Sequence, residues 1–86
     1  MNEFEEAMKE GYNIKLRNKL YGLLCEREKN GEWEKFLDSI LIEIMGFDEH
    51  RKTIDYYTLF YKLSSLKYLD YKYFRTTIFD CMGLIK

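Results

Sequence analysis

The sequence contains no proline and has only five glycines, two cysteines and one histidine among its 86 residues. Without proline, no position is barred from a helix interior by a missing backbone N–H. The two cysteines, Cys25 and Cys81, are too few for the disulfide framework of a small secreted domain. Both lie in apolar helical patterns, so we expect buried free thiols in a reducing cytoplasm.

The distribution of apolar residues also predicts neither a secretory signal peptide nor a membrane-spanning segment. The first ten residues are acidic and lack the hydrophobic run of a secretory signal peptide. No apolar stretch approaches the length that crosses a bilayer. We therefore expect a soluble cytoplasmic protein with no membrane partner.

Residues that could hold a metal ion or a cofactor are scarce. His50 has Asp48 and Glu49 nearby, but a zinc site normally has four ligands dominated by Cys and His. No glycine-rich phosphate-binding loop is present. We therefore expect no metal, no cofactor and no small-molecule substrate.

The sequence likewise offers no recognisable catalytic group. It lacks the Gly-x-Ser-x-Gly turn of serine hydrolases, and a pair of Cys25 or Cys81 with His50 would have no local signature. Asp38 and Glu43 lie on an otherwise apolar segment, where a raised pKa would suit acid catalysis. A narrow polar stripe on a helix explains these two carboxylates better, so we expect that the protein is not an enzyme.

Apolar residues, by contrast, are abundant and recur with the period of a helix. They make up 47% of the chain, and this length provides for one core, so we predict a single helical domain over residues 1–86. Helices are predicted at about 2–10, 13–29 and 32–45, then from Asp48 or Thr53 onward, and at about 71–82. The predicted fold class is all-α, a small single-domain bundle or orthogonal array of four to five helices.

Short polar and glycine-containing positions predict the helix boundaries. Gly11 and Gly46 are expected to end the helices before them, and Asp70 precedes the last helix. Asn30-Gly31 favours a left-handed backbone. This pair could also close a β-hairpin, but its flanks do not alternate, so we interpret it as a helix–helix turn.

The predicted inner faces follow the spacing of one helical side. Because Ile42 and Met45 widen the apolar face of segment 32–45, we expect this helix at the centre of the fold. A strand over 39–45 is the main alternative, since isoleucine favours strands, but strict alternation is absent. The residues expected inside are Tyr12, Leu16, Leu20, Leu23, Leu24, Trp33, Phe36, Leu37, Ile40, Leu41, Ile44, Tyr56, Leu59, Phe60, Leu63, Leu66, Phe74, Ile78, Phe79, Met82 and Ile85.

Charge is nearly balanced overall but is unevenly distributed. Residues 1–43 hold seven basic and ten acidic side chains, a net charge of −3, and residues 44–86 hold seven basic and five acidic, a net charge of +2. Within the second half, the segment 51–75 has six basic and two acidic residues. The two halves are expected to attract each other within one bundle, and the overall charge of −1 does not demand a nucleic-acid partner.

Aromatic residues are the most conspicuous feature, with eight Tyr, six Phe and one Trp. The same basic segment interleaves many of them with lysine and arginine. Three interpretations compete: solvated packing surface, a protein-binding face, and nucleic-acid contact through a helix-turn-helix. The residues that we predict to bind a partner are Tyr57, Tyr61, Tyr68, Lys72, Tyr73 and Arg75.

These observations favour contact over catalysis. We predict a non-enzymatic interaction protein, a regulator, adaptor or inhibitor that binds another protein, with a homodimer as a variant. The alternative is a small nucleic-acid-binding transcriptional regulator that uses residues 51–75. In composition the chain resembles the small helical accessory proteins of phages and other mobile elements in AT-rich bacteria, a resemblance that transfers no site residue.

Overall fold

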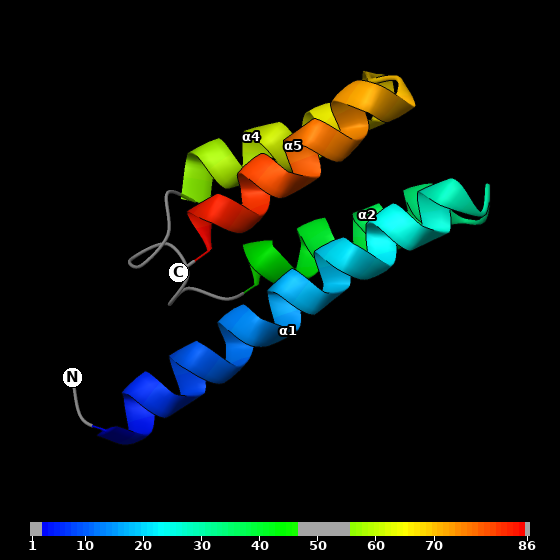
Figure 1. Cartoon of the computed structure of the whole chain (residues 1–86). Coiled ribbons are helices and arrows are strands. Elements are labelled where there is room, and N and C mark those ends of the chain that lie inside the picture. The colour runs from blue at the N-terminus through cyan, green and yellow to red at the C-terminus, as the bar shows by residue number, and fades with distance from the viewer. Residues whose placement is uncertain (1–2, 47–55, 86) are drawn as a thin grey trace.

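The computed structural model describes residues 3–46 and 56–85, which form four α-helices and one 3₁₀ turn. The first hairpin consists of α1 (Glu3–Glu28) and α2 (Trp33–Met45). The second consists of α4 (Tyr56–Ser65), the 3₁₀ turn η1 (Leu66–Tyr68) and α5 (Tyr71–Leu84). We call this second unit, residues 56–85, the α4–α5 hairpin (Figure 1).

The two hairpins pack against each other as an up-down-up-down bundle. Helix α1 contacts α2 and α5, and α4 contacts α5 and α2, so the four helices enclose one core between them. The described chain measures 42 × 21 × 20 Å along its principal axes. The predicted all-α class is confirmed, and the helices form a bundle of neighbours running in alternating directions.

One continuous apolar cluster fills the space between the hairpins. Its largest completely enclosed side chain is Phe74, and every described helix contributes leucine or isoleucine to the same cluster. Most of the expected inner positions are confirmed, since helical spacing places them on one side of each helix. The buried members are Leu16, Leu20, Leu23, Leu24, Trp33, Leu37, Ile40, Ile44, Leu59, Leu63, Leu66, Phe74, Ile78, Cys81 and Ile85.

Helix α1 is longer than the sequence predicts. We expected Gly11 to end a short first helix, but α1 runs without a break through Gly11 to Glu28. Gly11 does not adopt a positive φ, so it does not make the left-handed stop that glycine favours. The result is a helix whose first turns extend past the other three (Figure 1).

The turns differ in how closely they follow the sequence. Asn30 adopts the left-handed conformation with φ of 58°, and the Gly31 N–H donates to the Glu26 carbonyl at 2.9 Å, which ends α1 as a Schellman motif. The predicted helix–helix turn is therefore confirmed.

Gly46 ends α2 as predicted, but its φ is −82°, so no left-handed stop forms there. Asp70 precedes α5 as predicted, and the structure shows that it also caps this helix, its Oδ1 accepting from the Tyr73 N–H at 3.1 Å.

Several predicted burial states are wrong. Helix α2 is one wall of the bundle and not its centre, since Ile42 and Met45 are exposed. Phe79 is 43% exposed on the outside of α5, because a step of five residues turns it roughly 140° from Phe74.

Cys25 is exposed, contrary to the prediction, while Cys81 is buried as expected. The predicted starts of the fourth helix, Asp48 and Thr53, lie outside the described residues.

Candidate interaction surface

The six residues predicted to bind a partner all lie on the α4–α5 hairpin, and all are exposed. We call this set the hairpin surface. The four tyrosines are among the most accessible large side chains, with exposures of 80% for Tyr57, 77% for Tyr61, 88% for Tyr68 and 59% for Tyr73. Lys72 and Arg75 are exposed as well. None of the six fills the core, so the exposed ring area of the four tyrosines can contact a partner.

The α4 part of the hairpin surface is aromatic. Tyr57 and Tyr61 are four residues apart and therefore lie on the same side of the helix. They line a shallow hollow of about 720 Å³ together with Thr58, Phe60, Lys62 and Ser64. Buried Leu59 and Leu63 anchor the opposite side of α4 in the core, which fixes the direction in which both tyrosines point.

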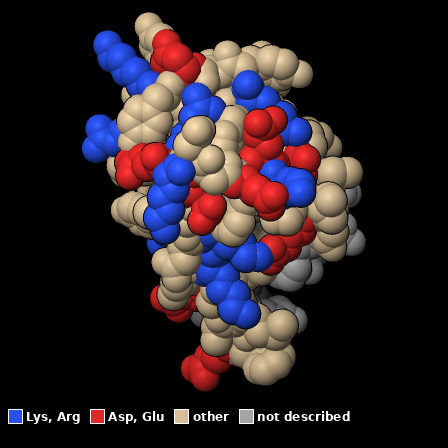
Figure 2. Space-filling view, turned by 90° about the vertical axis from the view of Figure 1, so that its right-hand side faces the viewer, with Lys and Arg blue, Asp and Glu red and all other residues tan. Residues whose placement is uncertain are grey.

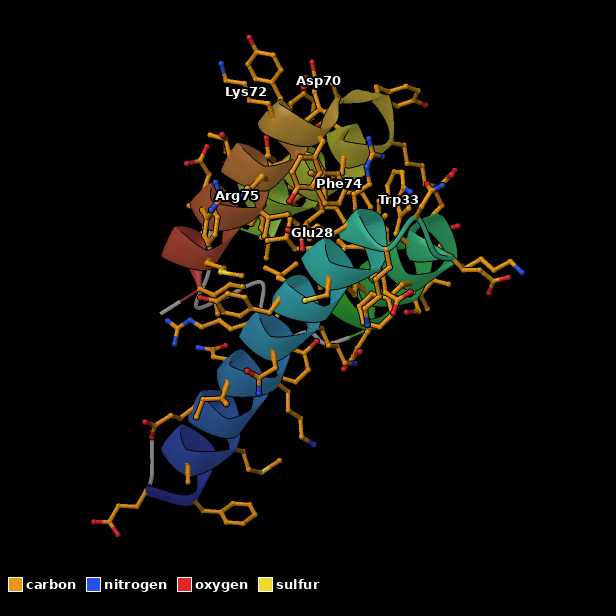
Figure 3. The ribbon with its side chains drawn as sticks, turned by 45° about the vertical axis from the view of Figure 1, so that its right-hand side comes forward. Glu28, Trp33, Asp70, Lys72, Phe74 and Arg75 are labelled. Carbon is orange, nitrogen blue, oxygen red and sulfur yellow. The ribbon has the colours of Figure 1, made fainter. Side chains whose placement is uncertain are left out.

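The α5 part carries the cations. Lys72 and Arg75 lie on the outer side of α5, whereas Phe74 between them points inward toward Trp33 (Figure 3). The Arg75 guanidinium lies 5.3 Å from the centroid of the Phe79 ring, an arrangement that holds both groups by a cation–π contact. Phe79 therefore belongs beside the hairpin surface, although the sequence pattern placed it inside.

Tyr73 lies on a different flank of α5 from Arg75. Asp80 reaches α4, where its carboxylate lies 4.0 Å from the Lys62 ammonium. Tyr73 is seven residues before Asp80 and so lies on the same side of the helix as Asp80. The hairpin surface thus spans the outside of both α4 and α5.

Tyr71 is not one of the six residues of the hairpin surface. It donates its hydroxyl to Glu28 on α1, and this hydrogen bond raises the pKa of the Tyr71 phenol.

Two lysines of the basic segment 51–75 lie close to an acidic side chain of another helix, which balances their charge. Lys67 donates to Asp38 of α2 at 2.7 Å, and this hydrogen bond raises the pKa of the Lys67 ammonium. Lys62 faces Asp80, as described above. Lysine and arginine are interspersed with aspartate and glutamate on the end of the molecule shown in Figure 2. Within the described residues, the basic segment therefore does not form a single-sign stripe of the type that binds nucleic acid.

A cationic side chain ties the α4–α5 hairpin to the end of α1. The Arg27 guanidinium lies 4.5 Å from the Trp33 ring centroid and 5.1 Å from that of Phe74. The two rings meet edge to face at 5.2 Å. Arg27 also donates to the Leu69 carbonyl at 3.4 Å, just before α5 begins. This cluster positions the connection between η1, which carries Tyr68, and α5, which carries Lys72.

The described residues hold no cluster of side chains that could bind a metal ion. No group of three His, Cys, Asp or Glu side chains comes together there, and His50, Asp48 and Glu49 lie outside those ranges. The two carboxylates considered for acid catalysis are both engaged, Asp38 with Lys67 and Glu43 with Lys19 of α1.

Comparison with known proteins matched no family model, no curated protein and no solved structure. In residues 3–46 and 56–85, no helix combines the length and the apolar character needed to cross a membrane.

Proposed function

We propose that this protein acts without catalysis, by binding another protein through the hairpin surface. The observation that carries the proposal is the exposure of Tyr57, Tyr61, Tyr68 and Tyr73 on one hairpin whose other side is anchored in the core. Tyrosine offers a large contact area with few rotatable bonds and a hydroxyl that bonds at a wet rim. A rigid helical pair therefore presents these rings at a low entropic cost of binding.

The charge arrangement favours a protein over a nucleic acid as the partner. Binding to phosphates draws its affinity from lysines and arginines that neutralise many charges along a groove. Lys62 and Lys67 already face Asp80 and Asp38, which leaves Lys72 and Arg75 as the cations of the hairpin surface. In addition, α4 and α5 run side by side in opposite directions (Figure 1), whereas the helices of a helix-turn-helix cross steeply.

The test compares two variants by affinity purification from the native cell, with and without nuclease. The first variant carries Tyr57→Ala, Tyr61→Ala and Arg75→Ala. The control carries Ile42→Ala and Lys35→Ala, two exposed positions on α2. We expect the wild type and the control to retain the same protein partner after nuclease treatment, and the triple variant to lose it.

Stability measurements accompany this comparison. Exposed substitutions usually change the free energy of unfolding by about 0.5 kcal/mol or less, so we expect the triple variant to melt close to the wild type. Recovery that depends on nucleic acid, or identical capture by the triple variant, would contradict the proposal. A large fall in melting temperature would show that these side chains serve the fold.

A further inference from the structure

The outward side of α1 carries a second apolar pattern that the bundle does not use. Seven of its residues recur in alternating steps of three and four, which is the heptad spacing of a coiled-coil contact. All seven are exposed, with Phe4 at 71%, Ile14 at 50% and Tyr21 at 52%. We call this set the α1 seam: Phe4, Ala7, Gly11, Ile14, Asn18, Tyr21 and Cys25.

The α1 seam lies on the side of the helix away from the core. Asn18 stands two residues from both Leu16 and Leu20, which turns it roughly 160° to 200° from these buried side chains. A further helix could therefore lie along the seam without displacing any core residue. The first turns of α1 also extend past the bundle (Figure 1), and a helical segment this short is marginal in water without a packing partner.

We propose that the α1 seam pairs with the α1 seam of a second copy of this chain, in an antiparallel two-helix contact. The matching register sets position i of one chain opposite position 25 − i of the other. Phe4 then meets Tyr21 of the second copy, and Gly11 meets its Ile14. Ala7 faces Asn18, a polar seam residue of the type that restricts register in coiled coils.

Side-chain size favours the antiparallel direction. In this direction a large residue meets a large one at each end, and each Ile14 fills the space left by the Gly11 that it faces. A parallel pair in register would set Gly11 against Gly11 and leave a gap at the centre, and such gaps cost packing energy. Antiparallel helices also bring opposite ends of their dipoles together.

Charge selects the register. One flank of the seam carries Glu10 and Arg17, seven residues apart. The proposed register brings this flank of the two copies together and sets each Glu10 next to Arg17 of the second copy, twice by symmetry. A shift by one heptad in one direction would oppose Glu10 to Glu10, and a shift in the other would oppose Arg17 to Arg17. Arg17 already donates one N–H to the Ile85 carbonyl, but a guanidinium has five N–H donors and can serve both partners.

This contact goes beyond the proposed function, because none of the six residues of the hairpin surface takes part in it. Loss of the dimer would leave the hairpin surface unaltered, and loss of partner binding would leave the α1 seam unaltered. The two proposals can therefore fail separately.

The first test is analytical ultracentrifugation of the full chain over a wide range of concentrations. We expect a monomer–dimer equilibrium in the wild type. Ile14→Lys places two charges at the centre of the contact and should weaken the dimer by about tenfold or more. Ile42→Lys, the same substitution at an exposed isoleucine of α2, is the control and should leave the dimer unchanged. A protein that is monomeric throughout, or a dimer that tolerates Ile14→Lys, would overturn the proposal.

The second test determines the direction of the pair and does not depend on the stability of one variant. Glu10→Arg and Arg17→Glu should each weaken the homodimer through like charges, whereas a mixture of the two variants should restore dimerisation as a heterodimer. In the wild type, the antiparallel register leaves Cys25 without a cysteine opposite it. Efficient Cys25–Cys25 crosslinking on mild oxidation, or a mixture no better than its components, would refute the antiparallel pairing.

Discussion

At the scale of single residues, the clearest division is between the aromatic side chains that make the core and those that lie outside it. Trp33 and Phe74 are buried, and the Arg27 guanidinium lies against both of their rings. Tyr61 and Tyr68 are more than three-quarters exposed. Aromatic residues therefore form both the core and the exposed surface. Arg27 is half-buried, and its charged group contacts the rings of two core residues.

Arg27 should contribute measurably to stability. Arg27→Ala removes the contacts with both rings and with the Leu69 carbonyl, so we expect a loss of about 1 to 2 kcal/mol in the free energy of unfolding. Urea denaturation of this variant would measure the loss. Lys29→Ala, an exposed position in the adjacent turn, serves as the control, and equal stability of the two variants would show that the ring contacts contribute nothing.

The buried thiol of Cys81 should make the fold sensitive to alkali. Burial raises the pKa of Cys81 from 9.0 to about 12. The thiol is neutral in both states below pH 9, so stability is unaffected there. Between pH 9 and 12 the unfolded chain loses this proton and the folded chain keeps it, so the free energy of unfolding should fall by up to about 1.4 kcal/mol per pH unit.

Cys81→Ser is the variant that isolates this effect, because a hydroxyl does not titrate in this range. It should lower stability at neutral pH but flatten the fall just above pH 9, where only a minor fraction of the tyrosines, with an ordinary pKa near 10, has ionised. The measurement is urea denaturation at several pH values. A slope that persists in Cys81→Ser would assign the alkaline sensitivity to another group.

At the scale of elements, local sequence signals succeed where one residue supplies the whole interaction. Asp70 is such a case, since its carboxylate alone accepts the Tyr73 N–H that starts α5. Gly11 is the opposite case. Glycine permits a helix end without requiring one, and α1 continues through it because the leucines that follow keep the helix packed on the bundle.

The cap at Asp70 is expected to stabilise the whole α4–α5 hairpin. Asp70→Ala should cost about 1 kcal/mol in the free energy of unfolding, as loss of a helix N-cap typically does. Asp70→Asn retains an accepting oxygen and should restore most of this loss. Thermal and urea unfolding of both variants would measure it, and a fully stable Asp70→Ala would mean that the Tyr73 N–H finds another acceptor.

At the scale of the whole molecule, the helical class, most of the core and the exposure of the predicted surface residues could be read from periodicity. The placement of helix neighbours could not, because a one-sided apolar pattern does not state which helix it faces. Phe79 and Ile42 illustrate this limit: each is apolar and near an inner face, yet both lie outside. The pairing of Lys67 with Asp38, 29 positions apart, likewise follows only from the assembled bundle.

The central claim is that the tyrosines of the hairpin surface are used for contact. It is tested most directly by chemical labelling of tyrosines in the isolated protein and in the complex recovered from its native cell, read residue by residue by mass spectrometry. We expect Tyr57, Tyr61, Tyr68 and Tyr73 to react readily in the isolated protein, where all four are exposed, and to be protected in the complex. Unchanged reactivity of all four in the complex would contradict the account.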